Sequence, residues 1–194
     1  MKSPTNLFID LNELELLAPT AIVGRTVRIR KPARVKIHDG SIIDDFTYIS
    51  CGLTVGCFSH IGANGVLIGG DAHITIGHFV NIAPGSRLIA ASNDFSGGPL
   101  AGPAIPPEYA GASITADIVL GDHVLFGANT VVLPGTIVPE GLAAGACTVL
   151  SPKIKLEPWT VYVGNPARPI KTRNREQLVT VAERIKQDMP DAFR

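Results

Sequence analysis

Residues that can accept or donate a proton surround one irregular stretch of the chain, residues 88–113. Asn93 and Asp94 stand near its start, and Asp71 and His73 precede it. A buried carboxylate with a raised pKa, or a neutral imidazole, can take a proton from an attacking nucleophile. Asp94 and His73 are therefore candidate catalytic residues, and Asn93 beside Asp94 is a third candidate that could orient a substrate. Their use depends on the elements that bring them together.

Apolar residues recur at every sixth position on both sides of this stretch. After it they are Leu120, Phe126, Val132, Val138, Ala144 and Leu150; before it they are Ile43, Ile49, Val55, Ile61 and Leu67, then Ile76, Ile82 and Leu88 after three extra residues. Upstream, Val23, Ile29 and Val35 fit after a two-residue slip. This period is neither helical nor that of a long strand. It is typical of short strands and tight turns, three to a coil, with coils stacked into a prism.

The repeat predicts an all-β fold, a parallel β-helix over residues 21–151 that carries a protruding loop at 90–113. Residues 1–20 form an N-terminal segment, and residues 152–194 form a tail with a C-terminal α-helix. Asn174 is the expected N-cap of that helix, with Leu178, Val181 and Ile185 on one face. We expect the helix to cap an open end of the prism without a catalytic role.

The two interruptions of the repeat fall at the same corner of the prism. Counting the turns places the extra residues near Asp71 and the start of the irregular stretch on one edge, one coil apart. Functional loops sit on rigid scaffolds in this way, and this loop is long for a simple connection. The shared corner is therefore the predicted active site, where Tyr109 could stack on a ring.

Composition restricts the partners of the chain. It has 17 Lys and Arg and 17 Asp and Glu, so charge gives no reason to expect nucleic acid or an anionic membrane. The stretch "MKSPTNLFIDLNELELLAP" has acidic residues within its apolar part and does not fit the pattern of a secretory signal. No apolar run approaches the roughly 20 residues needed to span a bilayer. Cys51, Cys57 and Cys147 form no CxxC pair and are expected to pack as small apolar residues. We expect a cytoplasmic protein.

Two segments carry a family resemblance. "GDHVLFGANTVVLPGTIVPEGLAAGACTVL" (121–150) and "EPWTVYVGNPARPIK" (157–171) resemble the acetyl-CoA-dependent sugar acetyltransferases of the hexapeptide-repeat superfamily. The likeness extends over residues 40–172. It implies a left-handed coil, a homotrimer, acetyl-CoA as cosubstrate with no metal, and CoA bound in a groove between neighbouring prisms.

The resemblance also assigns binding residues. Ala128 and Ala146 match positions whose backbone contacts the pantetheine arm, and Arg168 and Lys171 match positions that meet the CoA phosphates. The two alanines are 18 residues apart, which is one coil, so we expect them to stack on one edge. For the sugar, Asp71 matches an acidic residue that holds hydroxyls; Asn64 and His60 are weaker candidates. Leu125 stands where the family often has an aromatic residue.

The chain departs from the family at the expected base. The family has a catalytic His where the loop begins; here that position is Asn93, and no His lies between Ser92 and Ser113. Asp94 with a pKa raised by burial, or His73, could replace it. An amine needs less help, because an α-amino group already titrates at about 8. This departure favours an amine acceptor that Asn93 or Asp94 orients or deprotonates.

These observations predict transfer of acetyl to the amino group of a nucleotide-linked amino sugar, in the biosynthesis of a surface polysaccharide such as lipopolysaccharide. O-acetylation of a sugar hydroxyl is the alternative. A zinc-dependent, carbonic-anhydrase-like enzyme is a less favoured one, because His73 and His78 are five residues apart with His60 and His38 upstream. A purely structural hexapeptide subunit is a third. His123, in a turn, is expected at the surface.

Overall fold

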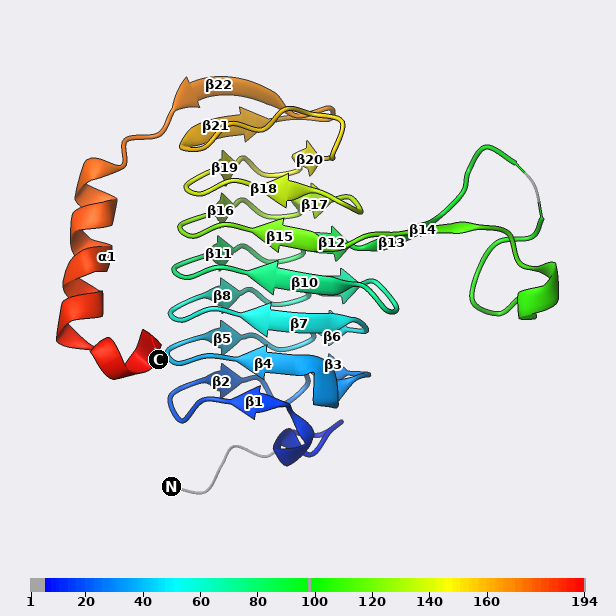
Figure 1. Cartoon of the computed structure of the whole chain (residues 1–194), viewed down its shortest axis with the longest axis horizontal. Helices are drawn as coiled ribbons and strands as arrows, with labels where there is room; N and C mark the ends of the chain where they lie inside the picture. The colour runs from blue at the N-terminus through cyan, green and yellow to red at the C-terminus, as the bar shows by residue number, and fades with distance from the viewer. Residues whose placement is uncertain (1–5, 98, 194) are drawn as a thin grey trace.

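The computed structural model describes residues 6–97 and 99–193. Short parallel strands stack into three sheets that enclose a triangular prism (Figure 1). Sheet A holds β1 (Leu16–Leu17), β4 (Val35–Ile37), β7 (Gly52–Val55), β10 (His73–Ile76), β15 (Ile118–Leu120) and β18 (Ile137–Val138). Sheet B holds β2 (Ile22–Val23), β5 (Ile42–Ile43), β8 (His60–Ile61), β11 (Asn81–Ile82), β16 (Leu125–Phe126), β19 (Ala143–Ala144), β21 (Thr160–Val163) and β22 (Arg168–Thr172). Sheet C holds β3 (Arg28–Ile29), β6 (Tyr48–Ile49), β9 (Val66–Ile68), β12 (Arg87–Ile89), β17 (Val131–Val132) and β20 (Val149–Leu150).

The coil is left-handed, as predicted. Strands of sheet A such as β4 and β7 run from right to left across the front of Figure 1 while the chain rises from its N-terminus. The chain visits sheets A, B and C in turn, so each coil has three corners. We call the turns from A to B the helix corner, those from B to C the alanine corner, and those from C to A the loop corner.

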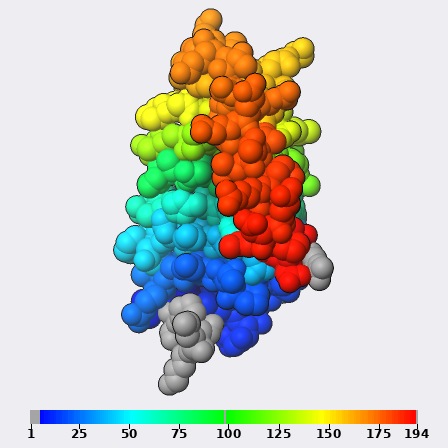
Figure 2. All heavy atoms as spheres, turned by 90° about the vertical axis from the view of Figure 1, so that its left-hand side faces the viewer, coloured from blue at the N-terminus to red at the C-terminus, as the bar shows by residue number. Residues whose placement is uncertain are grey.

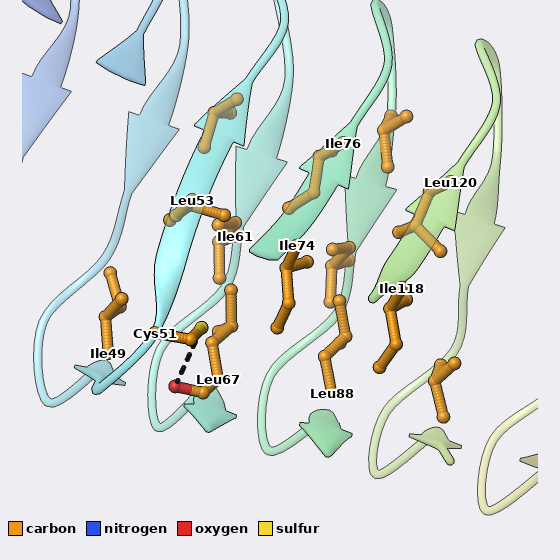
Figure 3. Close-up of a cluster of buried hydrophobic side chains, with 14 of the residues drawn as sticks. Ile49, Cys51, Leu53, Ile61, Leu67, Ile74, Ile76, Leu88, Ile118 and Leu120 are labelled. Carbon is orange, nitrogen blue, oxygen red and sulfur yellow. Dashed lines mark hydrogen bonds between the residues drawn. The ribbon is translucent and has the colours of Figure 1, made fainter. Parts of the chain in front are cut away.

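The sixth-position residues form the core. Figure 3 shows such side chains, among them Ile49, Ile61, Leu67 and Leu88, pointing into the prism, and all four are fully buried. Burying one such side chain contributes about 1.5–3 kcal/mol, so stability accumulates coil by coil. The strands of sheet A add a second inward residue, for example Ile74 before Ile76 on β10.

The helix corner is a stack of rings. Phe58, Phe79, His123 and Trp159 follow one another up this edge, with neighbouring ring centroids 5.3–5.8 Å apart. Each of the four has a positive φ, between 52° and 62°, as the tight turns require. His123 is only 5% exposed, so the predicted surface position is wrong. It is buried because its turn places the ring between Phe79 and Trp159.

The C-terminal helix α1 (Glu176–Asp188) lies along the side of the prism at the helix corner (Figure 2). It was expected at an open end; instead β22 pairs antiparallel with β21 at that end. The helix begins two residues after Asn174, whose side chain accepts a hydrogen bond from Glu176 N. Ala182 is its buried residue, whereas Val181 is 53% exposed. Within the described residues, no helix is long and apolar enough to cross a membrane.

Candidate functional site

The loop corner carries extra residues in three coils. They are the 3-10 helix η2 (Pro32–Arg34) before β4, residues 69–72 before β10, and a long arm before β15. The second and third lie at the same corner, as predicted. The first accounts for the two-residue slip in the repeat, which the sequence analysis did not place at this corner.

The arm is a hairpin that projects from the prism on the side opposite α1 (Figure 1). Its strands β13 (Ala91–Asn93) and β14 (Ser113–Thr115) pair antiparallel, with Asn93 opposite Ser113. Near its tip lies the 3-10 helix η3 (Pro107–Tyr109). Large apolar side chains are exposed along the arm: Phe95, Leu100, Tyr109 and Ile114. The arm therefore presents both polar and apolar groups away from its own core.

Asp94 differs from the expectation of a buried acid. Its side chain is exposed and accepts hydrogen bonds from Ser96 N (2.8 Å) and Ser96 Oγ (2.5 Å). These bonds stabilise the carboxylate, so the pKa of Asp94 is lowered rather than raised. Asp94 is thus an ionised acceptor of hydrogen bonds beside Asn93. Such a group suits an amine or ammonium better than it suits deprotonation of a hydroxyl.

Asp71 lies at the same corner, clamped by two cations. Its Oδ1 is 2.8 Å from Lys31 Nζ and 3.9 Å from Arg34 Nη1. The hydrogen bond from Lys31, followed by its charge, lowers the pKa of the Asp71 carboxyl. Both cations also hold the turn through its backbone, by bonds to Gly70 O (2.7 Å) and Asp71 O (2.9 Å).

His73 opens strand β10 directly after this turn. Its backbone N–H donates to Asp117 Oδ1 (2.8 Å), and its ring Nε2 lies 2.9 Å from Thr54 Oγ1. Gly52 leaves room for the ring, since a Cβ there would collide with His73 Nδ1. Burial, followed by the charge of Arg34, lowers the pKa of His73. A neutral imidazole at the loop corner fits the predicted role of a proton acceptor.

The structure does not bring His60 and Asn64 to this corner within one chain. His60 faces outward from sheet B, with Nε2 2.8 Å from Asp44 Oδ2 and Nδ1 3.2 Å from Asn81 Oδ1. Asn64 turns the alanine corner with φ 60°. His60 therefore lies on the face of sheet B and Asn64 at the alanine corner, and neither lies at the corner that carries the arm.

The alanine corner matches the predicted stacking. Strands β16 and β19 pair in register, so Ala128 and Ala146 lie on successive coils of one edge, and Cys147 N donates to Ala128 O (2.9 Å). Gly127 packs closely against the next coil, since a Cβ built on Gly127 would lie only 2.5 Å from Ala146 N. Higher on the same side, Arg168 and Lys171 are exposed on β22. The edge combines small side chains with cations at its upper end.

Sheet C separates the alanine corner from the loop corner. The chain leaves the alanine corner, crosses sheet C as β12, and only then enters the arm. One chain therefore presents the predicted CoA edge and the predicted acceptor loop on two different edges.

The histidines of the zinc alternative are also apart. His73 begins β10, whereas His78 lies beyond its other end, where its Nδ1 accepts from Cys57 N (3.0 Å). In the part of the chain that the structure describes, no three His, Cys, Asp or Glu side chains are placed together to hold a metal ion.

Sequence reasoning missed several polar partners in these regions. They are Lys31, Arg34, Thr54 and Asp117 at the loop corner, and Asp44 and Asn81 beside His60. The slip between Ile29 and Ile37 was a usable signal, since extra residues at a known corner must project there. The partners of His60 carry no such signal.

Comparison with known proteins identifies relatives over most of the chain. No protein-family model matches it. It is 32% identical over 165 residues to a dTDP-4-amino-4,6-dideoxy-D-glucose acyltransferase of Escherichia coli, covering 80% of this chain and 84% of the relative. It is 31% identical over 175 residues to WbbJ of E. coli K12, a putative lipopolysaccharide biosynthesis O-acetyl transferase, covering 81% and 85%.

Among solved structures, the fold is similar to AntD, an N-acyltransferase from Bacillus cereus. The complex of AntD with dTDP and 3-hydroxybutyryl-CoA superimposes with a TM-score of 0.85 at 32% identity, covering 96% of this chain and 100% of AntD. A variant of AntD holds dTDP-4-amino-4,6-dideoxyglucose and coenzyme A (TM-score 0.80, 33% identity, 95% and 99% coverage). The chain therefore belongs to the hexapeptide-repeat sugar acyltransferases, enzymes of left-handed β-helical fold that take their acyl group from CoA thioesters.

Proposed function

We propose that this enzyme transfers an acetyl group from acetyl-CoA to the amino group of a nucleotide-linked amino sugar, in the cytoplasm, for a surface polysaccharide. The observation that carries the proposal is the exposed, ionised Asp94 beside Asn93 at the start of the arm. An ammonium group binds well to such a carboxylate. The fraction of the amine that is neutral near pH 7 can attack directly, whereas a hydroxyl must be deprotonated as it attacks. The E. coli acyltransferase and AntD, both related over most of their length, support an amino-sugar acceptor.

In the proposed reaction the amine nitrogen attacks the thioester carbonyl carbon. A C–N bond forms, the C–S bond breaks, and CoA leaves as the thiol once its sulfur receives a proton. The amine must lose one proton as it becomes an amide. Asn93 and Asp94 orient the amine, and the candidate base is His73, which lies at the same corner one coil below the arm and has a pKa lowered by burial.

We propose further that the working form is a homotrimer. The CoA edge and the arm lie on different edges of one chain, so the arm of a neighbouring copy must reach the alanine corner of this one. The outward side of sheet C supports such contact, because partly buried apolar side chains line it: Val66, Ile68, Ile89, Val131, Leu133 and Val149. The exposed apolar side chains of the arm would pack on the neighbour.

O-acetylation is the second candidate, and one observation favours it. His73 is a neutral imidazole at the loop corner, as a hydroxyl acceptor requires. The similarity to WbbJ points in the same direction.

The test is release of free thiol from acetyl-CoA with a panel of acceptors. We expect turnover with nucleotide-linked amino sugars, above all dTDP-linked ones, and a product with a new amide by mass spectrometry. Neutral sugars are the matched acceptors that lack the amine. Turnover confined to neutral sugars would refute N-acetylation and support the second candidate. 3-Hydroxybutyryl-CoA should be run beside acetyl-CoA to define the acyl group.

A further inference from the structure

Positive charge is concentrated in the first coils of an otherwise neutral chain. Between Ala21 and His38 there are six Lys and Arg residues and no Asp or Glu. They are Arg25, Arg28, Arg30, Lys31, Arg34 and Lys36. Lys36 is neutralised locally, because its Nζ lies 2.9 Å from Glu15 Oε1. These cations are distributed around one coil, and Lys31 and Arg34 are the two that meet at the loop corner, where they would attract an anionic ligand.

Two of these cations converge on a single, almost fully exposed carboxylate. Lys31 and Arg34 project from η2 across one intervening coil and meet at Asp71, whose side chain is 96% exposed. The path of Arg34 depends on Gly52, since a Cβ there would lie 3.1 Å from Arg34 Nη2. Two positive charges, on Lys31 and Arg34, face the one negative charge of Asp71. The group of three therefore has a net positive charge that is exposed to solvent at the loop corner.

We propose that Lys31 and Arg34 bind the diphosphate of the nucleotide-linked acceptor, and that Asp71 occupies these cations only while the acceptor is absent. This inference rests on the proposed function. A diphosphate carries at least two negative charges and several acceptor oxygens. It therefore matches a guanidinium and an ammonium better than one carboxylate does.

The position of the clamp agrees with this role. The turn that holds Asp71 lies one coil below the arm, and neighbouring strands are about 4.8 Å apart. The clamp and the root of the arm share the loop corner, so an acceptor bound along this corner would meet the clamp with its diphosphate and the arm with its amino sugar. The cations predicted for CoA, Arg168 and Lys171, lie at the opposite end of the prism. The two anionic substrates would be directed to different ends.

This assignment reverses the effect expected of Asp71. If Asp71 held sugar hydroxyls, its removal would weaken acceptor binding. In the clamp it competes with the diphosphate, so its removal must strengthen binding. The sign of one substitution therefore separates the two roles.

The test is calorimetric titration of the full-length protein with dTDP at constant ionic strength. We expect Asp71→Asn to lower the Kd about threefold, the range of an exposed ion pair. The double variant Lys31→Gln, Arg34→Gln should raise it tenfold or more, which is the loss of charge-assisted phosphate contacts. Lys36→Gln, from the same cationic segment but paired with Glu15, is the matched control and should leave the Kd unchanged.

Kinetics and the nucleoside complete the experiment. The double variant should raise the KM of the nucleotide sugar and leave the KM of acetyl-CoA unaltered. Thymidine, which lacks phosphates, should bind the double variant and the parent protein equally weakly. The inference is overturned if Asp71→Asn weakens dTDP binding, if the double variant binds dTDP normally, or if only the KM of acetyl-CoA changes. A clamp that binds dTDP as described in an enzyme that does not acylate amino sugars would instead refute the proposed function alone.

Discussion

The two ends of the sheet A strands carry corners of opposite kind. At the helix corner four coils turn tightly through the rings of the stack, and α1 lies along the prism at this corner. At the loop corner three coils add residues, Lys31 and Arg34 meet Asp71 in solvent, and Asp94 is exposed at the start of the arm. Both corners belong to the same strands, so the scaffold alone does not decide which of them carries chemistry.

The difference lies in what each corner buries. Phe79 and Trp159 stack at one corner, where Arg173 donates to the carbonyl of His123 (2.6 Å) and ties the tail to the prism. At the other corner Phe95 is 90% exposed and the carboxylates face water. The helix corner therefore buries rings that stabilise the fold, and the loop corner is where we propose that the reaction takes place.

The largest expected effect is on activity at the loop corner. The double variant Asn93→Ala, Asp94→Ala should lower kcat/KM by about a hundredfold or more, because it removes the groups that orient the amine. Thermal unfolding should be unchanged, since Asp94 is exposed and outside the core. Glu108→Gln removes a charge elsewhere in the arm and is the control. An unchanged rate in the double variant would place the site elsewhere.

At the helix corner the expected loss is one of stability. Trp159→Ala should lower the free energy of unfolding by about 3 kcal/mol, because a buried ring is lost and a cavity opens beneath Gly141. Trp159 is 8% exposed, whereas Tyr109 on the arm is 64% exposed. Tyr109→Ala is therefore the matched control and should cost less than about 0.5 kcal/mol in denaturant unfolding. Equal losses would abolish the contrast between the corners.

A smaller effect is expected at the alanine corner. Ala146→Trp places a bulky side chain on an exposed turn of the predicted CoA edge and should raise the KM of acetyl-CoA about tenfold, a loss of about 1.4 kcal/mol of binding. Steady-state kinetics should show little change in the KM of the acceptor. Glu140→Trp adds the same ring to the same coil at the helix corner. If Glu140→Trp raises the KM of acetyl-CoA as much as Ala146→Trp does, CoA does not bind at the alanine corner.

The smallest effect is a loss of stability in acid. Burial lowers the pKa of His123 in the folded chain, so the unfolded state binds the proton more tightly. The free energy of unfolding should therefore fall as the pH drops below about 6.5, the ordinary pKa of histidine. Thermal unfolding of the parent and of His123→Asn between about pH 7.5 and pH 5.5 measures it. If the stability of His123→Asn falls with pH as steeply as that of the parent, groups other than His123 cause the loss.

Most of the fold could be predicted from the sequence because the period of six is strict. Leu88 and Leu120 marked the two ends of the arm, and the register of Ala128 with Ala146 followed from their spacing. The ion pairs at the corners could not be predicted, because long side chains such as Lys31 cross coils that are distant in sequence. The pKa of Asp94 depends on a local bond to Ser96 that no spacing reveals.

The separation of the two substrate edges was predictable in principle. Counting turns from Ile61 places His60 on sheet B and Asp71 at the loop corner, whereas the family likeness assigned both to one acceptor site. Within one chain the structure does not bring these two residues together. We propose that the site is completed between neighbouring copies, and this is the central claim of the proposed mechanism.

Subunit mixing tests that claim most directly. The Ala146→Trp chain has an unmodified arm, and the Asn93→Ala, Asp94→Ala chain has an unmodified CoA edge. We suppose that each site joins the CoA edge of one copy to the arm of the next. In trimers assembled at random from equal amounts of the two chains, about a quarter of the sites then combine an unmodified edge with an unmodified arm. We predict recovery of roughly that fraction of parental activity under subsaturating acetyl-CoA, above the sum of the separate variants. Mixed trimers seen by native mass spectrometry without any such gain would contradict a site shared between copies.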